Sequence, residues 1–222
     1  MTEELRGDPI PMGVSNGSAV LRDIRLDIGN EEVLRRLRMS TDEYQHSSEM
    51  RELFRATVAR GWRLISPAAV CMTRGLLSIQ DAVVRFRGTG FHVRSSGVAA
   101  LIEGCTSATL MAATIGPALS SAMDELMAGK RMTEAMIMDA FGSEAVEGAV
   151  NSLCRLLQES DAGEESVSTK RFSPGYGDWD LSAQREVLEE LGAGRIGISI
   201  SSSSILIPEK SITAIMGWRL KE

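Results

Sequence analysis

The segment of residues 67–94 most restricts the folds that this chain can adopt. It holds three short runs rich in apolar and β-branched residues, AAVCMTRGLLSI, DAVVRFRG and GFHVRS. Such runs are typical of strands, and Gly88, Thr89 and Gly90 between the last two are typical of a hairpin turn. Because strands joined by a tight turn pair antiparallel, the segment predicts an antiparallel sheet.

Patterns with helical spacing lie on both sides of this segment. We expect helices over residues 30–39 (N-cap Asn30), 41–62 (Phe54 and Trp62 inward), 97–104 (cap Ser95 or Ser96), 117–129, 132–158 and 181–194. In the last of these, Leu181, Gln184, Leu188 and Leu191 share one face.

Further strands are expected over residues 21–28 and 106–116. Residues 195–218 are expected to form a strand, turn, and resume as a strand after Pro208, and the serine run 201–204 is assigned to an edge or cavity-lining strand. Residues 1–20 are predicted to be a flexible or edge segment and residues 159–170 a solvated loop. Helices and strands do not alternate as βαβα units, so we predict an α+β fold. One domain is expected over residues 1–222, with residues 1–65 as an N-terminal strand-plus-helix portion.

Charge and composition narrow the function. The net charge is −6 and no basic cluster stands out, which argues against binding to nucleic acid. No signal pattern or membrane-length apolar run is present, so we expect a cytoplasmic protein without a membrane partner. The three cysteines lack paired spacing and the two histidines lie far apart, so buried thiols are favoured over a metal or redox site.

A search for catalytic motifs is negative. The sequence contains no GxGxxG followed by an acidic residue, no GxxxxGK[ST], no GxSxG and no HExxH. A chemical function must therefore depend on binding and positioning.

The stretch RFSPGYGDWD, residues 171–180, is the first candidate site. Pro174-Gly175 and Gly177-Asp178 are turn signals on either side of Tyr176. The glycines let the backbone approach a ligand, Arg171 offers a fork for a carboxylate, and Tyr176 adds a hydroxyl on an apolar ring. This set suits a small zwitterion or nucleoside, although a purely structural loop explains the composition equally well.

The second candidate is the helix that contains MDAFGSEAVEGAVNSLC. Val146, Val150, Leu153 and Leu157 form its buried stripe, whereas Glu144, Glu147, Asn151 and Cys154 share another face beside small residues. An inward carboxylate there suits a ligand ammonium group. A solvated glutamate face, with glycines for close helix packing, is the simpler interpretation.

These two segments, the helix first and the loop after it in the chain, resemble the vitamin B12-dependent methionine synthase activation domain. The resemblance is carried by MDAFGSEAVE, RFSPGYGDWDLSAQREVLEELG and IGISISSSSILIPEKSITAIMGW, and GCTSATLMAATIG and NEEVLRRLRM are similar to stand-alone members of the family. It implies a twisted antiparallel sheet flanked by helices. It also implies binding of S-adenosylmethionine, which methylates a corrinoid (cobalamin) after one-electron reduction by flavodoxin, ferredoxin or a similar donor.

The resemblance also assigns roles to residues of this chain. Arg171 corresponds to an arginine that contacts S-adenosylmethionine, Glu147 to the acidic residue that receives its amino group, and Tyr176 to the tyrosine near the methyl donor and the corrinoid, the one catalytic assignment. Pro174, Gly175 and Gly177 correspond to the residues that shape the loop. No metal ligand is implied.

The chain departs from the family at two places. Ser201, Ser202 and Ser203 replace a Thr-Glu-Ser element, and the cobalamin-binding DxHxxG motif is absent. The corrinoid is therefore expected on a partner, either a separate corrinoid protein or a methionine synthase core. Two alternatives stay open: a non-catalytic corrinoid-protein-binding or chaperone module, and a different S-adenosylmethionine-dependent methyltransferase.

Overall fold

The computed structural model describes residues 13–15, 17–39, 44, 47–160 and 166–221. Its main sheet has the strand order β1-β2-β3-β6-β10-β7, and every pair is antiparallel. These strands are β1 (Gly13–Ser15), β2 (Ser18–Arg22), β3 (Ala68–Gln80), β6 (Ser107–Thr114), β10 (Ser211–Leu220) and β7 (Ser166–Ser168). The far half of β3 pairs with β4 (Val83–Phe86), which pairs with β5 (His92–Arg94). A separate hairpin joins β8 (Ser199–Ile200) and β9 (Leu206–Ile207).

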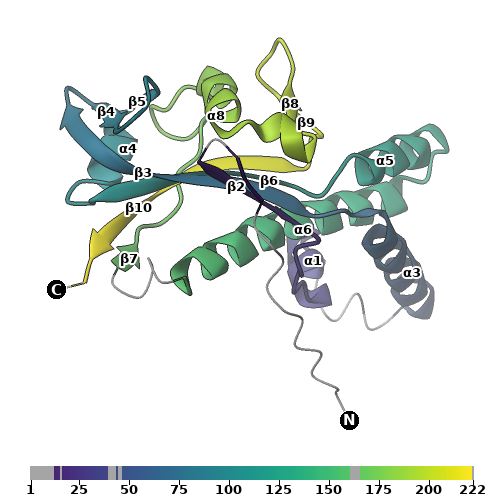
Figure 1. Ribbon diagram of the computed structural model, residues 1–222. Helices are drawn as coiled ribbons and strands as arrows, with labels where there is room; N and C mark the ends of the chain where they lie inside the picture. The colour runs from purple at the N-terminus through teal and green to yellow at the C-terminus, as the bar shows by residue number, and fades with distance from the viewer. Residues whose placement is uncertain (1–12, 16, 40–43, 45–46, 161–165, 222) are drawn as a thin grey trace.

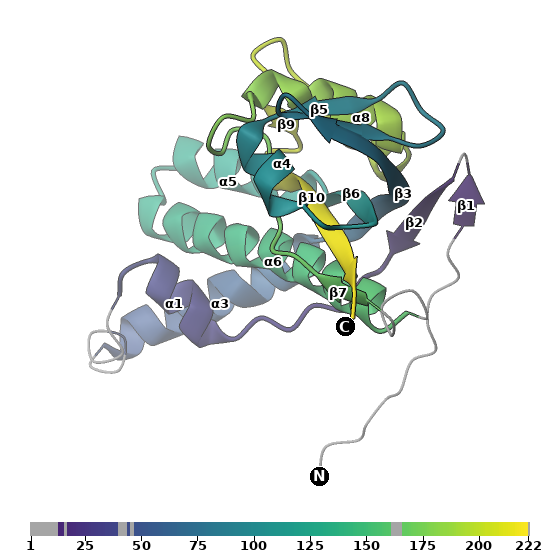
Figure 2. The ribbon, with the colours of Figure 1, turned by 90° about the vertical axis from the view of Figure 1, so that its left-hand side faces the viewer.

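Helices cover both faces of the sheet (Figures 1 and 2). One face carries α1 (Asn30–Arg36), α3 (Ser48–Leu64), α5 (Ala118–Ala128) and the long α6 (Met132–Gln158). The other carries α4 (Ser96–Leu101), the 3-10 turn η1 (Leu181–Ala183), α8 (Gln184–Leu191), the 3-10 turn η2 (Ala193–Ile196) and the β8–β9 hairpin. This arrangement confirms the expected α+β class with a curled antiparallel sheet flanked by helices.

The central strand β6 shows how the sheet forms two cores. Leu110 and Ala112 pack toward α4 and α8, whereas Met111 and Ala113 pack toward α6. Both faces are therefore buried, as the continuous apolar run of this strand predicted. On the α6 side, Phe54 of α3 and Phe141 of α6 belong to a further core that the N-terminal helices share with α5 and α6.

The hairpin at residues 88–90 is confirmed, and each of the six predicted helices has a counterpart in the structure, with shifts at its ends. Ser95 is the N-cap of α4, and Gly192 ends α8 in the left-handed conformation. Asn30 is the first residue of α1 rather than its cap, which is Gly29. The helix expected over 41–62 is α3, which begins at Ser48; residues 41–43 lie outside the described residues.

Residues 21–28 are not a strand beyond Arg22, which corrects the prediction. Arg22 pairs with Ala68, the first residue of β3, so β3 offers no partner to the residues that follow Arg22. The alternation still describes burial, because Ile24, Leu26 and Ile28 contact the cores that involve α6.

The serine run is a turn, and not the edge or cavity-lining strand that we expected. Ser204 has φ +62°, and its N–H donates to the carbonyl of Ser201, which closes the β8–β9 hairpin. The loop expected over 159–170 contains the short strand β7, and residues 161–165 lie outside the described residues. Trp62 was expected to face inward, yet 40% of it is exposed, and its ring meets Phe141 edge-on at 5.3 Å. None of the helices in the described part of the chain combines the length and apolar character that a bilayer crossing needs.

Candidate functional site

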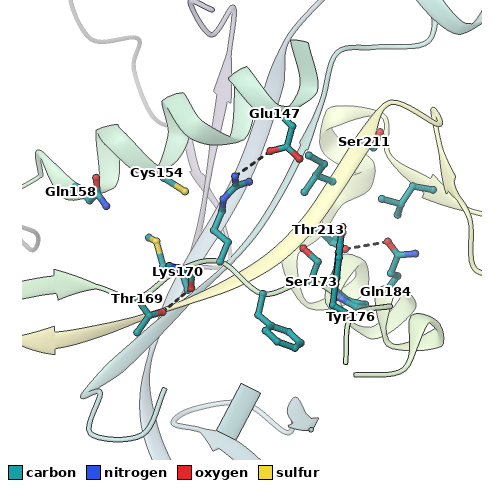
Figure 3. Close-up of a pocket in the computed structure, with 16 residues that line it drawn as sticks. Glu147, Cys154, Gln158, Thr169, Lys170, Ser173, Tyr176, Gln184, Ser211 and Thr213 are labelled. Atoms are coloured by element: carbon teal, nitrogen blue, oxygen red, sulfur yellow. Dashed lines mark hydrogen bonds and ion pairs between the residues drawn. The ribbon is translucent and has the colours of Figure 1, made fainter. Parts of the chain in front are cut away.

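A cavity of about 680 Å³ lies beside β10, between residues 169–176, helix α6 and the N-terminal end of α8 (Figure 3). Its volume is in the range of small-molecule sites. We call residues 169–176 the crossing segment. Four groups of residues line the cavity: Glu147, Cys154 and Gln158 from α6; Thr169, Lys170, Arg171, Phe172, Ser173, Pro174 and Tyr176 from the crossing segment; Gln184 from α8 and Leu206 from β9; and Ser211, Ile212, Thr213 and Met216 from β10.

Main-chain hydrogen bonds hold the crossing segment against β10. The N–H of Phe172 donates to the carbonyl of Ile215 over 2.9 Å, and the N–H of Ile215 donates back over 2.8 Å. The N–H of Thr169 donates to the carbonyl of Gly217 over 2.9 Å, and the hydroxyl oxygen of Thr169 accepts from the N–H of Gly217 over 2.9 Å. Because side chains alternate along such an extended segment, Arg171 faces α6 whereas Phe172 packs into the core on the α8 side.

Arg171 and Glu147, predicted as ligand contacts from separate segments, meet in the cavity. Nη2 of Arg171 donates to Oε2 of Glu147 over 3.1 Å (Figure 3). The same nitrogen donates to Oδ1 of Asn151 over 2.9 Å. Both members of the ion pair are partly exposed, with side-chain exposures of 26% and 42%. The cavity thus offers a cation and an anion side by side, which matches the two charges of an amino acid.

The predicted turn places Tyr176 at the rim of the cavity. Pro174 is buried, whereas 68% of Tyr176 is exposed. The turn requires left-handed backbone at Gly175 (φ +92°) and Gly177 (φ +55°), and the N–H of Gly175 donates to the carbonyl of Trp179 over 2.7 Å. These two glycines shape the loop and are not among the residues that line the cavity.

Asp178 attaches this loop to the first turn of α4. Its carboxylate accepts hydrogen bonds from the Ser95 hydroxyl (2.6 Å), the Ser96 hydroxyl and the N–H groups of Ser96 (2.7 Å) and Gly97 (3.1 Å). The hydroxyl groups of Ser95 and Ser96 and these N–H groups hold the pKa of Asp178 well below its ordinary value. The carboxylate therefore stays ionised and pins the loop to a helix more than 80 residues away in the sequence.

Trp179 anchors the other side of the loop. It is 2% exposed, stacks on Phe172 with ring centroids 6.4 Å apart, and belongs to the core that contains Val187 and Leu191 of α8. Trp179 therefore anchors the loop against α8.

The cavity also contains a buried amide that sequence analysis did not identify as a site residue. Gln184 is 6% exposed; its Nε2 donates to the carbonyl of Ser204 over 2.7 Å, and its Oε1 accepts from the Thr213 hydroxyl over 3.2 Å. The sequence did contain a signal for this role, because Gln184 is a polar residue on the apolar face of the helix predicted over residues 181–194. Ser211 and Thr213, on a strand predicted only from its apolar residues, carried no such signal.

The thiols follow the expectation of burial only in part. Cys71 is buried, and burial together with the nearby Cys154 raises its pKa to about 11. Cys154 is half-buried at the cavity wall; burial raises its pKa, with Arg171 lowering it and Glu147 raising it. Both thiols are therefore protonated and poorly nucleophilic near neutral pH. In the described residues, no three His, Cys, Asp or Glu side chains gather as a metal-binding group.

Comparison with known proteins finds a match in structure. The crystal structure of the MetH reactivation domain bound to AdoHcy superposes with a TM-score of 0.67, covering 100% of this chain and 84% of that chain, at 11% sequence identity. The fold is that of the MetH reactivation domain. No family model and no curated protein sequence matches the chain. The likeness establishes the fold, and the ligand named there belongs to the neighbour.

Proposed function

We propose that the protein binds S-adenosylmethionine in the cavity beside β10 and acts as a free-standing reactivation partner for a separate corrinoid protein. The observation that carries this proposal is the meeting of Arg171 and Glu147 in one cavity, with Tyr176 at its rim. The same fold binds AdoHcy in the MetH reactivation domain, which supports a ligand of this class.

The residues of the cavity fit such a ligand. The guanidinium of Arg171 matches a carboxylate, and the carboxylate of Glu147 matches an ammonium group, so an amino-acid end can replace their mutual ion pair without leaving either charge unpaired. The exposed ring of Tyr176 at the rim offers a flat apolar surface to the rest of the ligand. Its position at the rim suits a group near the site where the bound methyl donor meets its acceptor, and this is the role that we assign to it.

The chemistry depends on positioning. When bound, S-adenosylmethionine would supply an electrophilic methyl group to the cobalt of a partner-bound corrinoid, once an external donor such as flavodoxin or ferredoxin has reduced that cobalt by one electron. S-adenosylhomocysteine would be the leaving group. The residues of this chain hold the amino-acid end, orient the ligand and keep the rim of the cavity accessible to the partner.

A second candidate function is a module that binds a corrinoid protein without methyl transfer. The β8–β9 turn favours it, because Ser201, Ser202 and Ser203 stand where the family carries an acidic residue. Loss of a contact to S-adenosylmethionine is compatible with a protein that has kept the fold and still binds a corrinoid protein, but no longer transfers a methyl group.

Calorimetric titration with S-adenosylmethionine tests the proposal. We expect the wild type to bind, and Arg171→Ala to abolish the heat of binding, because the ligand carboxylate loses its partner while Glu147 keeps an uncompensated charge. Arg155→Ala, which removes an exposed arginine of α6 that does not line the cavity, is the matched control and should bind as the wild type does. Absence of binding by the wild type at high ligand concentration contradicts the proposal.

A spectroscopic assay separates the two candidate functions. Both predict association with a corrinoid protein, but only the reactivation partner restores methylcobalamin absorbance from cob(II)alamin when S-adenosylmethionine and a reductant are present. Binding without recovery of this absorbance favours the non-catalytic module.

A further inference from the structure

We propose that Gln184 and Thr213 form the base-recognition end of the cavity, with Gln184 as a specificity-determining residue for a 6-aminopurine. This inference rests on the proposed function, because it assigns the other end of the same ligand. Gln184 and Thr213 are buried polar residues of the cavity that make no contact with the ion pair between Arg171 and Glu147.

The cavity spans the edge of the sheet, and its two halves differ in chemistry. Met216 belongs to the core on the α6 side of β10, whereas Ile215 belongs to the core on the α8 side. Thr213 shares the face of Ile215 because residues two apart in a strand point the same way. Glu147 and Gln184 consequently lie on opposite sides of β10 (Figure 3).

The ion pair of the cavity belongs to the α6 half. Glu147 and Arg171 form it. The other half combines the amide of Gln184 and the hydroxyl of Thr213 with the apolar surfaces of Leu206, Pro174 and Tyr176. An uncharged, flat ring with hydrogen-bond donors and acceptors at its edge suits this half, and a zwitterion suits the first.

The orientation of the Gln184 amide follows from its partners. The carbonyl of Ser204 can only accept, so the group that faces it at 2.7 Å is the NH2 group, and Oε1 faces the Thr213 hydroxyl. Each bond uses one of two available positions, which leaves one N–H and one oxygen lone pair on the amide. A glutamine amide with these two positions free matches adenine, whose amino group donates and whose ring nitrogen accepts.

The backbone of β10 adds to this end. In an antiparallel strand the main-chain groups of alternate residues point to the same edge. Those of Ile215 bond Phe172, so those of Thr213 are directed to the same edge, where the cavity lies. A purine beside Gln184 therefore has main-chain groups as well as a fixed amide within its surroundings.

The test compares two ligands that differ at the purine 6-position and at the adjoining N1, which carries a hydrogen in the 6-oxo compound. S-adenosylhomocysteine carries an amino group at the 6-position, whereas S-inosylhomocysteine carries a carbonyl oxygen that would face Oε1 of Gln184, acceptor against acceptor. Calorimetry on the wild-type chain should give binding roughly tenfold to a hundredfold tighter for the adenosyl compound, the range of a bidentate base contact. Equal binding of the two compounds overturns this inference and leaves the proposed function standing. Failure of both to bind overturns the proposed function and this inference together.

A matched pair of variants assigns the discrimination to one side chain. In Gln184→Met the ratio of the two dissociation constants should fall to near one, whereas Gln158→Met, the same change at a cavity residue of the α6 half, should keep the wild-type ratio. Circular dichroism checks that each variant is folded. If Gln184→Met does not fold, the ratio of the two dissociation constants measured for the wild-type protein tests the inference on its own. A folded Gln184→Met that keeps full discrimination shows that Gln184 only anchors the β8–β9 hairpin, and this overturns the assignment.

Discussion

At the scale of single residues, the central feature is an ion pair built from groups that also suit a ligand. Arg171 bonds Glu147 and Asn151, and both charged side chains remain partly exposed. An ion pair exposed in this way adds little to stability. A zwitterion can therefore displace it at low cost, since each charge finds a new partner.

Replacing Glu147 tests this view. Glu147→Gln removes the partner for a ligand ammonium group, so we expect S-adenosylmethionine to bind about tenfold more weakly, in line with the loss of one charged hydrogen bond. The melting temperature should hardly change. The control is Glu144→Gln on the same helix, whose carboxylate pairs with Arg36 at 2.7 Å, outside the residues that line the cavity. Equal loss of affinity in both variants contradicts the assignment.

The two glycines of the Tyr176 loop should differ in their tolerance of alanine. Gly175 has φ +92°, and an added Cβ would lie 3.0 Å from Cδ1 of Leu181; Gly177 has φ +55°, near the left-handed minimum. We expect Gly175→Ala to cost about 2–3 kcal/mol of unfolding free energy and Gly177→Ala about 1 kcal/mol. Urea denaturation measures both, and the reverse order would show that the loop geometry is wrong.

At the scale of elements, the loop is presented to the cavity because three separate elements hold it. Main-chain bonds attach residues 169–172 to β10, Trp179 packs against α8, and Asp178 binds the first turn of α4. The short helix α4 therefore serves the site without touching the cavity. Its serine cap was predicted from the sequence, but its bond to Asp178 was not.

Asp178→Asn should loosen the loop. The variant keeps the shape of the side chain but loses the charge that accepts four hydrogen bonds, so we expect a lower melting temperature and weaker S-adenosylmethionine binding. Asp180→Asn is the control: this carboxylate caps η1 through Ser182 only, and the change should have the smaller effect on binding. A larger loss of binding in Asp180→Asn than in Asp178→Asn would contradict the role assigned to Asp178.

The stability that the Asp178 carboxylate contributes should decrease in acid, and the Asp178→Asn variant tests this. The pKa of Asp178 is lowered in the folded protein, so its contribution to stability is complete above the pKa of an unfolded aspartate, about 4, and is lost as the pH falls below that value. The difference in melting temperature between the wild type and Asp178→Asn should stay constant from pH 8 to about pH 5 and shrink in more acidic buffer. A difference that shrinks already near pH 7 would show that Asp178 is not held ionised.

Local patterns predicted most elements, because the signal for each lies within a few residues. Helix α6 keeps an apolar stripe to Gln158, and Ser95 caps the helix that directly follows it. The prediction failed where the partner decided the outcome. Ile24 alternates like a strand residue but has no strand beside it, and the serine run 201–204 lies between isoleucines but forms a turn with Ser204 in the left-handed conformation. The candidate site was predicted at Arg171 and Glu147 by resemblance, whereas Gln184 becomes a cavity residue only once β10 and the β8–β9 hairpin lie beside α8.

At the scale of the whole molecule, the sheet edge explains how one cavity can hold two kinds of chemistry. Strand β10 pairs with β6 along most of its length, but on its other side β7 covers only residues 218–220. The crossing segment and the cavity occupy the rest of that edge, so helices from both faces of the sheet contribute side chains to one site (Figures 1 and 3). A fold with 11% identity to its neighbour can keep this edge because it depends on strand order rather than on particular side chains.

A crystal structure of the protein with S-adenosylhomocysteine would show directly where the ligand binds. We expect ligand density along the open edge of β10, with the amino-acid end replacing the ion pair between Arg171 and Glu147 and the purine beside Gln184 and Tyr176. Density at another surface, or an unchanged ion pair in an empty cavity at saturating ligand, would contradict this expectation.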